Sequence, residues 1–99
     1  MMKVPPPIVN GKNNRRRYKR SQFEVIFEIL HIIKEGEKVK TRIMYAANLD
    51  WRNFSKYMDF LIGHGFIKKD KNEKFELTEL GCKLYNSLYD LFTIIGSKP

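Results

Sequence analysis

The chain has 99 residues, of which 42% are hydrophobic and 30% charged, so it can form one small domain with a core but not two. Its formal net charge is +8, and residues 1–20 hold seven basic residues and no acidic one, whereas the other 79 residues hold 12 basic and 11 acidic ones. The single cysteine and the lack of a long apolar run exclude a disulfide framework and a membrane span, and the charge favours a polyanionic partner.

The N-terminal 20 residues are expected to form a disordered basic arm in front of the folded domain. Residues 1–14 contain three consecutive prolines together with glycine and asparagine, a composition that cannot build a core. The RRRYKR segment at 15–20 follows, and such arms bind the phosphate backbone or an adjacent minor groove. The alternative is a tail that serves solubility or localisation. The candidate contacts in this arm are Arg15, Arg16, Arg17, Lys19 and Arg20.

The first predicted helix begins after Ser21 and ends at Gly36. Ser21 and Glu24 have the spacing of a capping box, in which each side chain accepts a hydrogen bond from the backbone of the other residue. Apolar residues recur on two sides of this helix, which predicts burial on both sides. One stripe consists of Phe23, Ile26, Phe27, Leu30 and Ile33, and the other of Val25, Ile29 and Ile32.

Two further helices are predicted, the first over 42–47 after a Thr41 cap and the second over 51–64 after an Asp50 cap. A turn at 48–49 separates them. The longer helix has an apolar stripe with the spacing of one helix face, which predicts its core side. The members of this stripe are Phe54, Tyr57, Met58, Leu61 and Ile62.

The spacing of apolar residues then changes from the helical period to a period of two, which predicts a hairpin. Its strands lie at 66–69 and 74–77, joined by a polar turn at 70–73. Thr78 is expected to cap a last helix that reaches about residue 95. One side of this helix has a leucine spacing similar to a short coiled-coil seam. The residues expected on that side are Leu80, Leu84, Leu88, Leu91 and Ile95.

The order of elements is helix, short helix, turn, longer helix, hairpin and helix, and a helix-turn-helix followed by a hairpin is the arrangement of a winged helix. The segment GHGFIKKDKNEKFELTELGCKLY resembles the hairpin of winged-helix regulators. RSQFEVIFEIL and KTRIMYAANLDWRNFSKYMDFLIGHGFI resemble small archaeal winged-helix proteins, and the likeness covers about 19–92. It implies a mostly α fold with a small β-hairpin and a DNA-binding regulator or chromatin-associated protein. The chain is then divided into an arm at 1–20 and a winged-helix domain at 21–95, with a dimerisation helix at about 78–95.

In a winged helix the third helix enters the major groove of duplex DNA, with the side opposite its core stripe toward the bases. That side holds Trp51, Arg52, Asn53, Ser55 and Lys56. Arg52 can bind guanine, Asn53 adenine and Lys56 a phosphate, whereas the alternative is an ordinary solvent-exposed face. Trp51 either packs on the preceding helix or contacts a sugar or a thymine methyl group.

Two other positions are expected to contact the DNA backbone. Thr41 and Arg42 begin the second helix, where a hydroxyl cap and backbone N–H groups can bind phosphate, although plain capping is the alternative. The hairpin carries a cluster of lysines, which either contacts DNA or only keeps the wing soluble. The candidate contacts of the wing are Lys69, Lys71 and Lys74.

We also expect a homodimer, because the last helix presents an apolar seam and the second stripe of the first helix needs a cover. The alternative is that these two stripes cover each other within one chain. The candidate interface residues are Val25, Ile29, Ile32, Leu84, Leu88, Leu91, Phe92 and Ile95.

Enzymatic chemistry is not expected from this sequence. His31, His64 and Cys82 lack metal-ligand spacing, and there is no phosphate-binding loop or nucleophile elbow. No cofactor and no small-molecule effector is indicated, no secretory signal is found, and a cytoplasmic, nucleoid-associated location is expected. A protein-interaction module, favoured by the nearly neutral body, and an RNA-binding protein are the alternatives to binding double-stranded DNA.

Overall fold

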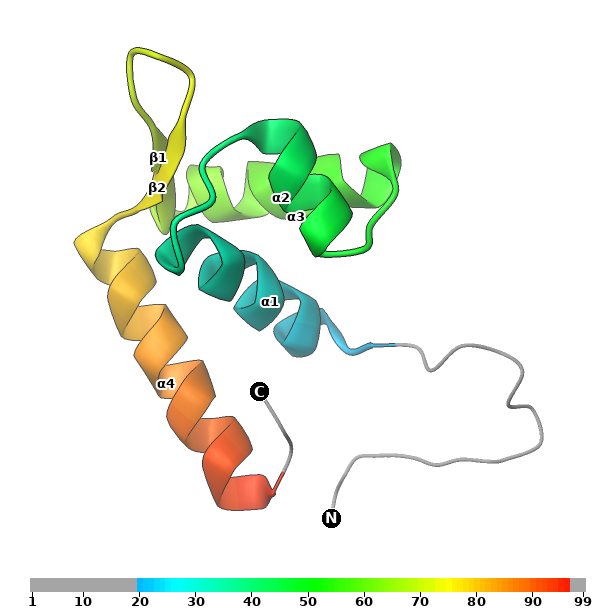
Figure 1. Cartoon of the computed structure of the whole chain (residues 1–99). Helices are drawn as coiled ribbons and strands as arrows, with labels where there is room; N and C mark the ends of the chain where they lie inside the picture. Colours follow the sequence, from blue (N-terminus) through cyan, green and yellow to red (C-terminus); the bar gives the residue numbers. More distant parts are fainter. Residues whose placement is uncertain (1–19, 97–99) are drawn as a thin grey trace, which may run out of the picture.

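A computed structural model describes residues 20–96, so the tail and the arm residues up to 19 lie outside the described part of the chain. The described part contains four helices and one two-stranded antiparallel hairpin (Figure 1), which confirms the predicted fold class. The elements are α1 (Gln22–Lys34), α2 (Lys40–Ala46), α3 (Trp51–Gly63), β1 (Ile67–Lys69), β2 (Phe75–Leu77) and α4 (Glu79–Ile95).

Three of these helices begin at the cap residues that the sequence predicts. Ser21 Oγ accepts a hydrogen bond of 3.1 Å from the Glu24 N–H, and the Glu24 carboxylate accepts one of 2.8 Å from the Ser21 N–H, which completes the capping box. Asp50 and Thr78 cap α3 and α4, each accepting a bond of 2.9 Å from the N–H three residues later. These bonds satisfy N–H groups that have no partner within the helix.

The helix α2 begins earlier than predicted and without a side-chain cap. Lys40 is its first residue and Val39 its N-cap residue. The segment before it is shaped by the Glu37 carboxylate, which accepts hydrogen bonds from the N–H groups of Lys38 at 3.1 Å and Val39 at 3.0 Å. Thr41 therefore lies within the first turn of the helix, and the prediction that its hydroxyl caps α2 is wrong.

The hydrophobic core is built around α1, whose Ile29 and Leu30 have no exposed surface. This helix contacts α2, β2 and α4, so apolar residues on two of its sides are buried within one chain. Two residues predicted for buried stripes are instead at the surface, since Phe23 and Ile62 are 60% and 39% exposed. The buried core residues are Val25, Ile26, Phe27, Ile29, Leu30, Ile33, Ile43, Ala47, Phe54, Met58, Leu61, Ile67, Phe75, Tyr85, Leu88 and Phe92.

Aromatic side chains join α1 to α4. Phe27 stacks on Tyr85 with ring centroids 4.9 Å apart, and Phe92 meets Phe27 edge-on at 5.5 Å. The Tyr85 hydroxyl lies 2.9 Å from His31 Nδ1, and burial raises the pKa of this hydroxyl above its ordinary value. The buried face of α4 therefore consists of Tyr85, Leu88 and Phe92, which is rotated from the predicted leucine seam.

This packing corrects part of the predicted dimer interface. The second stripe of α1 is covered by its own chain, so the expectation that a second chain covers it is wrong and the intrachain alternative holds. Four of the predicted interface residues are buried within the chain, namely Val25, Ile29, Leu88 and Phe92. Two others, Ile32 and Leu84, are partly buried against the core. Of the predicted set, Leu91 and Ile95 are exposed.

The hairpin packs one of its faces on the core. Ile67 lies opposite Leu77 in the antiparallel pairing, and Ile67 and Phe75 are buried. The Phe75 N–H also donates a hydrogen bond of 3.0 Å to the Lys38 carbonyl, which ties the hairpin to the segment before α2. Each strand begins one residue later than predicted, and the hairpin itself is confirmed.

Gly81 allows α4 to start directly against the residue before β1. A Cβ atom at this position would lie 2.0 Å from the Phe66 carbonyl oxygen, far closer than nonbonded atoms approach. The same carbonyl accepts a hydrogen bond of 3.1 Å from the Thr78 N–H, and the Thr78 hydroxyl donates one of 2.5 Å to the Gly65 carbonyl. The threonine and the glycine of this T-x-x-G segment thus fix α4 relative to the wing.

Candidate nucleic-acid interface

The core contacts of α3 determine which of its residues face solvent. Phe54, Met58 and Leu61 are buried on one side of the helix. At about 100° per residue, the opposite side holds Arg52 and Lys56. Both cationic side chains are exposed, so these two predicted contacts lie at the centre of the outer face of α3.

The other predicted residues of α3 lie on the flanks of that outer face. Trp51 and the partly buried Ser55 are on the flank nearer the start of α2, whereas the exposed Asn53 is on the flank beside α1. A shallow hollow of about 320 Å³ separates α3 from the beginning of α1 there. It is lined by Gln22, Ile26, Asn53, Lys56, Tyr57 and Phe60. The five predicted residues therefore do not all lie on one face of α3.

Trp51 lies at the margin of the core and not within it. Its side chain is 54% exposed, and its ring centroid is 6.3 Å from that of Phe54. The Lys40 ammonium lies over the indole, 4.6 Å from the ring centroid, in a cation–π contact between the starts of α2 and α3. Trp51 thus combines packing at one edge with a large accessible surface.

Lys40 is a candidate contact that sequence reasoning missed. Besides contacting Trp51, it borders a hollow of about 240 Å³ between the start of α2 and the wing. Lys69 and Lys74 of the wing border the same hollow, so three lysines from two parts of the fold gather there. In the sequence, Lys40 is marked only by its position next to Thr41, a predicted backbone contact. Its actual neighbours cannot be predicted, because they depend on how the hairpin packs against residue 38.

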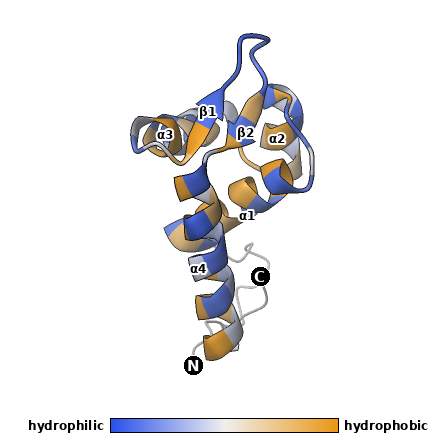
Figure 2. Cartoon of the chain, turned by 90° about the vertical axis from the view of Figure 1, so that its left-hand side faces the viewer, coloured by the Kyte–Doolittle hydropathy of each residue, from blue (hydrophilic) through white to orange (hydrophobic). Residues whose placement is uncertain are grey.

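The wing carries lysines on a turn built by an acidic residue. The Asp70 carboxylate closes the turn by accepting backbone hydrogen bonds of 2.8 and 3.0 Å, and the one from the Lys74 N–H lowers the pKa of that carboxyl. Lys69 Nζ lies 3.3 Å from the Glu73 carboxylate, an exposed pair of small energetic value. Lys71 is exposed in the turn, and Figure 2 shows the whole tip as hydrophilic.

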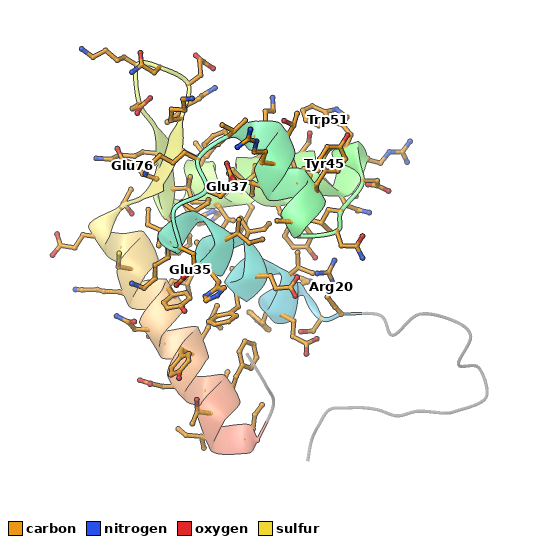
Figure 3. The ribbon with its side chains drawn as sticks, in the orientation of Figure 1. Arg20, Glu35, Glu37, Tyr45, Trp51 and Glu76 are labelled. Atoms are coloured by element: carbon orange, nitrogen blue, oxygen red, sulfur yellow. The ribbon has the colours of Figure 1, made fainter. Side chains whose placement is uncertain are left out.

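Arg20, the last residue of the predicted arm, contacts the domain itself. Its guanidinium forms an ion pair with the Glu28 carboxylate and donates a hydrogen bond of 3.3 Å to the Asn48 carbonyl, in the turn between α2 and α3 (Figure 3). The guanidinium is therefore engaged within the chain, and its predicted role as a nucleic-acid contact stays a prediction that competes with these intrachain contacts. The other predicted contacts of the arm, at 15–19, lie outside the described residues.

Charge is segregated between the elements of the nearly neutral body. Residues 22–37, which include α1, hold four acidic residues and one basic residue. Residues 38–58, which include α2 and the first half of α3, hold five basic residues and one acidic residue. Two of the four acidic residues lie in α1 and two in the turn after it, so the small net charge of the body includes an acidic segment at 22–37 and a basic segment at 38–58.

The helix α4 leaves an apolar stripe exposed beside its buried face. Leu80, Leu91 and Ile95 are 49%, 45% and 38% exposed, and Leu84 between them is partly buried. At about 100° per residue, these four side chains lie within about 60° of one another around the helix. Ile94, near the C-terminal end, is 80% exposed. The stripe runs along most of α4, which extends away from the wing (Figure 1).

The histidines and the cysteine occupy separate places. His31 contacts Tyr85, the His64 ring nitrogen Nδ1 lies 3.0 Å from the Phe60 carbonyl oxygen, and Cys82 is exposed on α4. Within residues 20–96, no three metal-ligating side chains come together. In the same part of the chain, no helix has the length and hydrophobicity needed to span a membrane.

Comparisons with known proteins agree with this architecture. The model of the winged helix-turn-helix family matches residues 19–95. The chain is 80% identical over 98 residues to the uncharacterized protein MJ0287 of Methanocaldococcus jannaschii, covering 99% of this chain and 100% of that protein. Among solved structures, it is similar to Sso10a-2, a DNA-binding protein from Sulfolobus solfataricus, with a TM-score of 0.65 and 30% identity over 78% of this chain and 83% of that one.

A further likeness concerns the fold alone. A MarR-family transcriptional regulator from Silicibacter pomeroyi superposes with a TM-score of 0.57 at 18% identity, over 67% of this chain and 49% of that chain. The family match at 19–95 includes every helix and strand of the described part, and the predicted resemblance to small archaeal winged-helix proteins is confirmed. This chain belongs to the winged helix-turn-helix family.

Proposed function

We propose that this protein binds double-stranded DNA without catalysing a reaction, as a transcriptional regulator or a chromatin-associated protein. The segregation of charge carries the proposal, because residues 38–58, which include α2 and the first half of α3, hold five basic residues and one acidic residue, whereas residues 22–37 hold four acidic residues and one basic residue. Support also comes from the similar fold of Sso10a-2, which is described as a DNA-binding protein.

In this proposal α3 enters the major groove with its outer face toward the bases. Arg52 binds the edge of a guanine, and Lys56, one turn later, binds a phosphate. Asn53 approaches an adenine from the flank beside α1, and Ser55 and Trp51 contact the opposite wall of the groove. Arg52 and Lys56 are favoured for these roles because they point directly away from the core of α3.

Contacts with the DNA backbone are proposed on either side of α3. The wing and the start of α2 share one hollow, which is bordered by three lysines and by Glu73, the ion-pair partner of Lys69. The residues proposed there are Lys40, Thr41, Arg42, Lys69, Lys71 and Lys74. Arg20 donates a hydrogen bond of 3.3 Å to the Asn48 carbonyl in the α2–α3 turn, and the arm precedes this residue in the sequence. We propose that the arm follows the backbone or enters an adjacent minor groove.

We further propose that two copies associate through α4. The stripe of Leu80, Leu84, Leu91 and Ile95 is apolar and partly exposed, and such a surface is typical of an interface. A two-fold axis through this contact places the two α3 helices about 34 Å apart, or a multiple of that distance, and makes the DNA site roughly palindromic.

The salt dependence of duplex binding tests the proposed function. If about five arm residues and two to four residues of the body contact phosphates, the log–log slope of affinity against salt is about −5 or more negative. Fluorescence anisotropy of a labelled duplex across a salt series measures this slope. A nearly flat dependence would contradict DNA binding, and tighter binding to an RNA of the same sequence would favour the RNA-binding alternative.

A further inference from the structure

Two large aromatic side chains are exposed on either side of the turn between α2 and α3. Tyr45, in the last turn of α2, is 75% exposed, and Trp51, the first residue of α3, is 54% exposed. Figure 3 shows both labelled rings at this end of the helix pair. The core does not require them, because the neighbouring Ala47 and Phe54 are buried and fill it at this point.

Cationic side chains lie on the two helices that carry these rings. The Lys40 ammonium lies 4.6 Å from the centroid of the Trp51 ring, and Arg42 and Arg52 are exposed on the same two helices. The first turns of α2 and α3 contain no acidic residue, and the Asp50 carboxylate between them is occupied by its cap bond to α3. Exposed aromatic rings can stack on the bases of a nucleic-acid strand, and nearby cationic side chains attract its anionic backbone.

A nucleobase offers its face to a protein ring only when it is unstacked. In duplex DNA the faces are stacked on one another, and only the edges are accessible in the grooves. We propose that Tyr45 and Trp51 form a stacking site for unpaired bases of a DNA strand, as found where a duplex is melted or distorted. This inference rests on the proposed function, because α2 and α3 bring the two rings to the DNA.

Lys40 links the stacking site to the binding of the backbone. Its ammonium covers part of the Trp51 ring and borders the same hollow as Lys69 and Lys74 of the wing. A base that stacks on Trp51 displaces this ammonium, which then lies close to the phosphates of the bound strand. The exchange replaces a cation–π contact with a base–ring contact and an ion pair.

The variant Tyr45→Ala tests the site, because Tyr45 has no part in the proposed duplex contacts and its side chain is mostly in solvent. We expect the full chain with Tyr45→Ala to bind a labelled oligothymidine strand about tenfold more weakly and a mixed-sequence duplex within about twofold of the original affinity. Tyr45→Phe keeps the ring and should restore strand binding. Tyr89→Ala removes a tyrosine on α4 that is 47% exposed, and it should change neither affinity.

Trp51 gives a second readout, because the sequence contains one tryptophan. We expect its fluorescence to be quenched more strongly by the single strand than by the duplex. Unchanged strand binding by Tyr45→Ala, or an equal loss with Tyr89→Ala, would overturn the inference, and tighter binding of oligouridine would overturn DNA as the ligand. If single strands fail to bind while the duplex shows a steep salt dependence, only this inference fails. If neither binds, the proposed function fails as well.

Discussion

Arg52 and Lys56 share the outer face of α3, but their loss should have different effects. We expect Arg52→Ala to cost about 1–3 kcal/mol of binding at a preferred site and less on random DNA, because a bidentate contact with guanine is lost. Asn53→Ala should act in the same direction. Lys56→Ala should weaken all sequences evenly, because a phosphate contact carries no sequence information. Competition binding with specific and random duplexes separates these outcomes, and equal losses on both for all three variants would contradict the placement of α3.

Gly81 should be the glycine that tolerates a side chain least. In Gly81→Ala the added methyl group meets the Phe66 carbonyl at 2.0 Å, so α4 and the wing must move apart. We expect a loss of about 2–3 kcal/mol or more in the free energy of unfolding, measured by urea denaturation. Gly63→Ala is the control, because a Cβ atom there meets nothing within 4 Å. A similar stability of the two variants would refute the role assigned to Gly81.

Some residue roles could be predicted from the sequence because they depend on near neighbours. Ser21, Asp50 and Thr78 cap helices through bonds that reach three residues along the chain, and all three predictions are confirmed. The sequence places Arg20 in the arm, because the partners that it contacts are 8 and 28 residues away. The surroundings of Lys40 cannot be predicted for the same reason, since they are formed by the distant hairpin and by Trp51.

At the scale of elements, the spacing of apolar residues in α4 does not determine which side of this helix is buried. Two apolar stripes with helical spacing run along this helix, so the sequence predicts an amphipathic helix but not which stripe is inside. The choice is made by Phe27 of α1, which stacks on Tyr85 and meets Phe92 edge-on. The stripe that includes Leu91 and Ile95 is thereby turned toward the surface.

The exposed stripe of α4 leads to a prediction about association. We expect the unmodified chain to sediment as a dimer at tens of micromolar, and Leu91→Glu with Ile95→Glu to give folded monomers that bind DNA much more weakly, because charges are then placed on the apolar surface. Asn86→Glu with Thr93→Glu adds the same charge to the opposite flank of α4 and should leave the dimer intact. Sedimentation of the unmodified chain as a monomer at that concentration would contradict the proposed interface.

At the scale of the whole molecule, the proposed DNA-binding surface and the proposed dimer surface of α4 are far enough apart to be occupied at the same time. The described residues span 47 × 28 × 21 Å, and the wing and the C-terminal end of α4 lie at opposite ends of the fold in Figure 1. Dimer contacts along α4 therefore leave α3, the wing and the basic segment at 38–58 accessible. In the proposed function the body supplies orientation and sequence preference, and much of the positive charge lies in the arm before it.

The arm should strengthen binding to every DNA sequence without stabilising the fold. Deleting residues 1–19 removes six of the 19 basic residues and no acidic one, and so lowers the net charge from +8 to +2. We expect weaker binding to all duplexes alike and a salt slope reduced in magnitude by about 4–5, since each lost phosphate contact accounts for about 0.9. The thermal midpoint should be unchanged, because the core residues of the described part of the chain run from Val25 to Phe92. Arg20→Gln is the control, since this guanidinium is paired with Glu28 and its loss should leave the salt slope as it is. A deletion that changed the sequence preference alone would mean that the arm reads bases, contrary to this expectation.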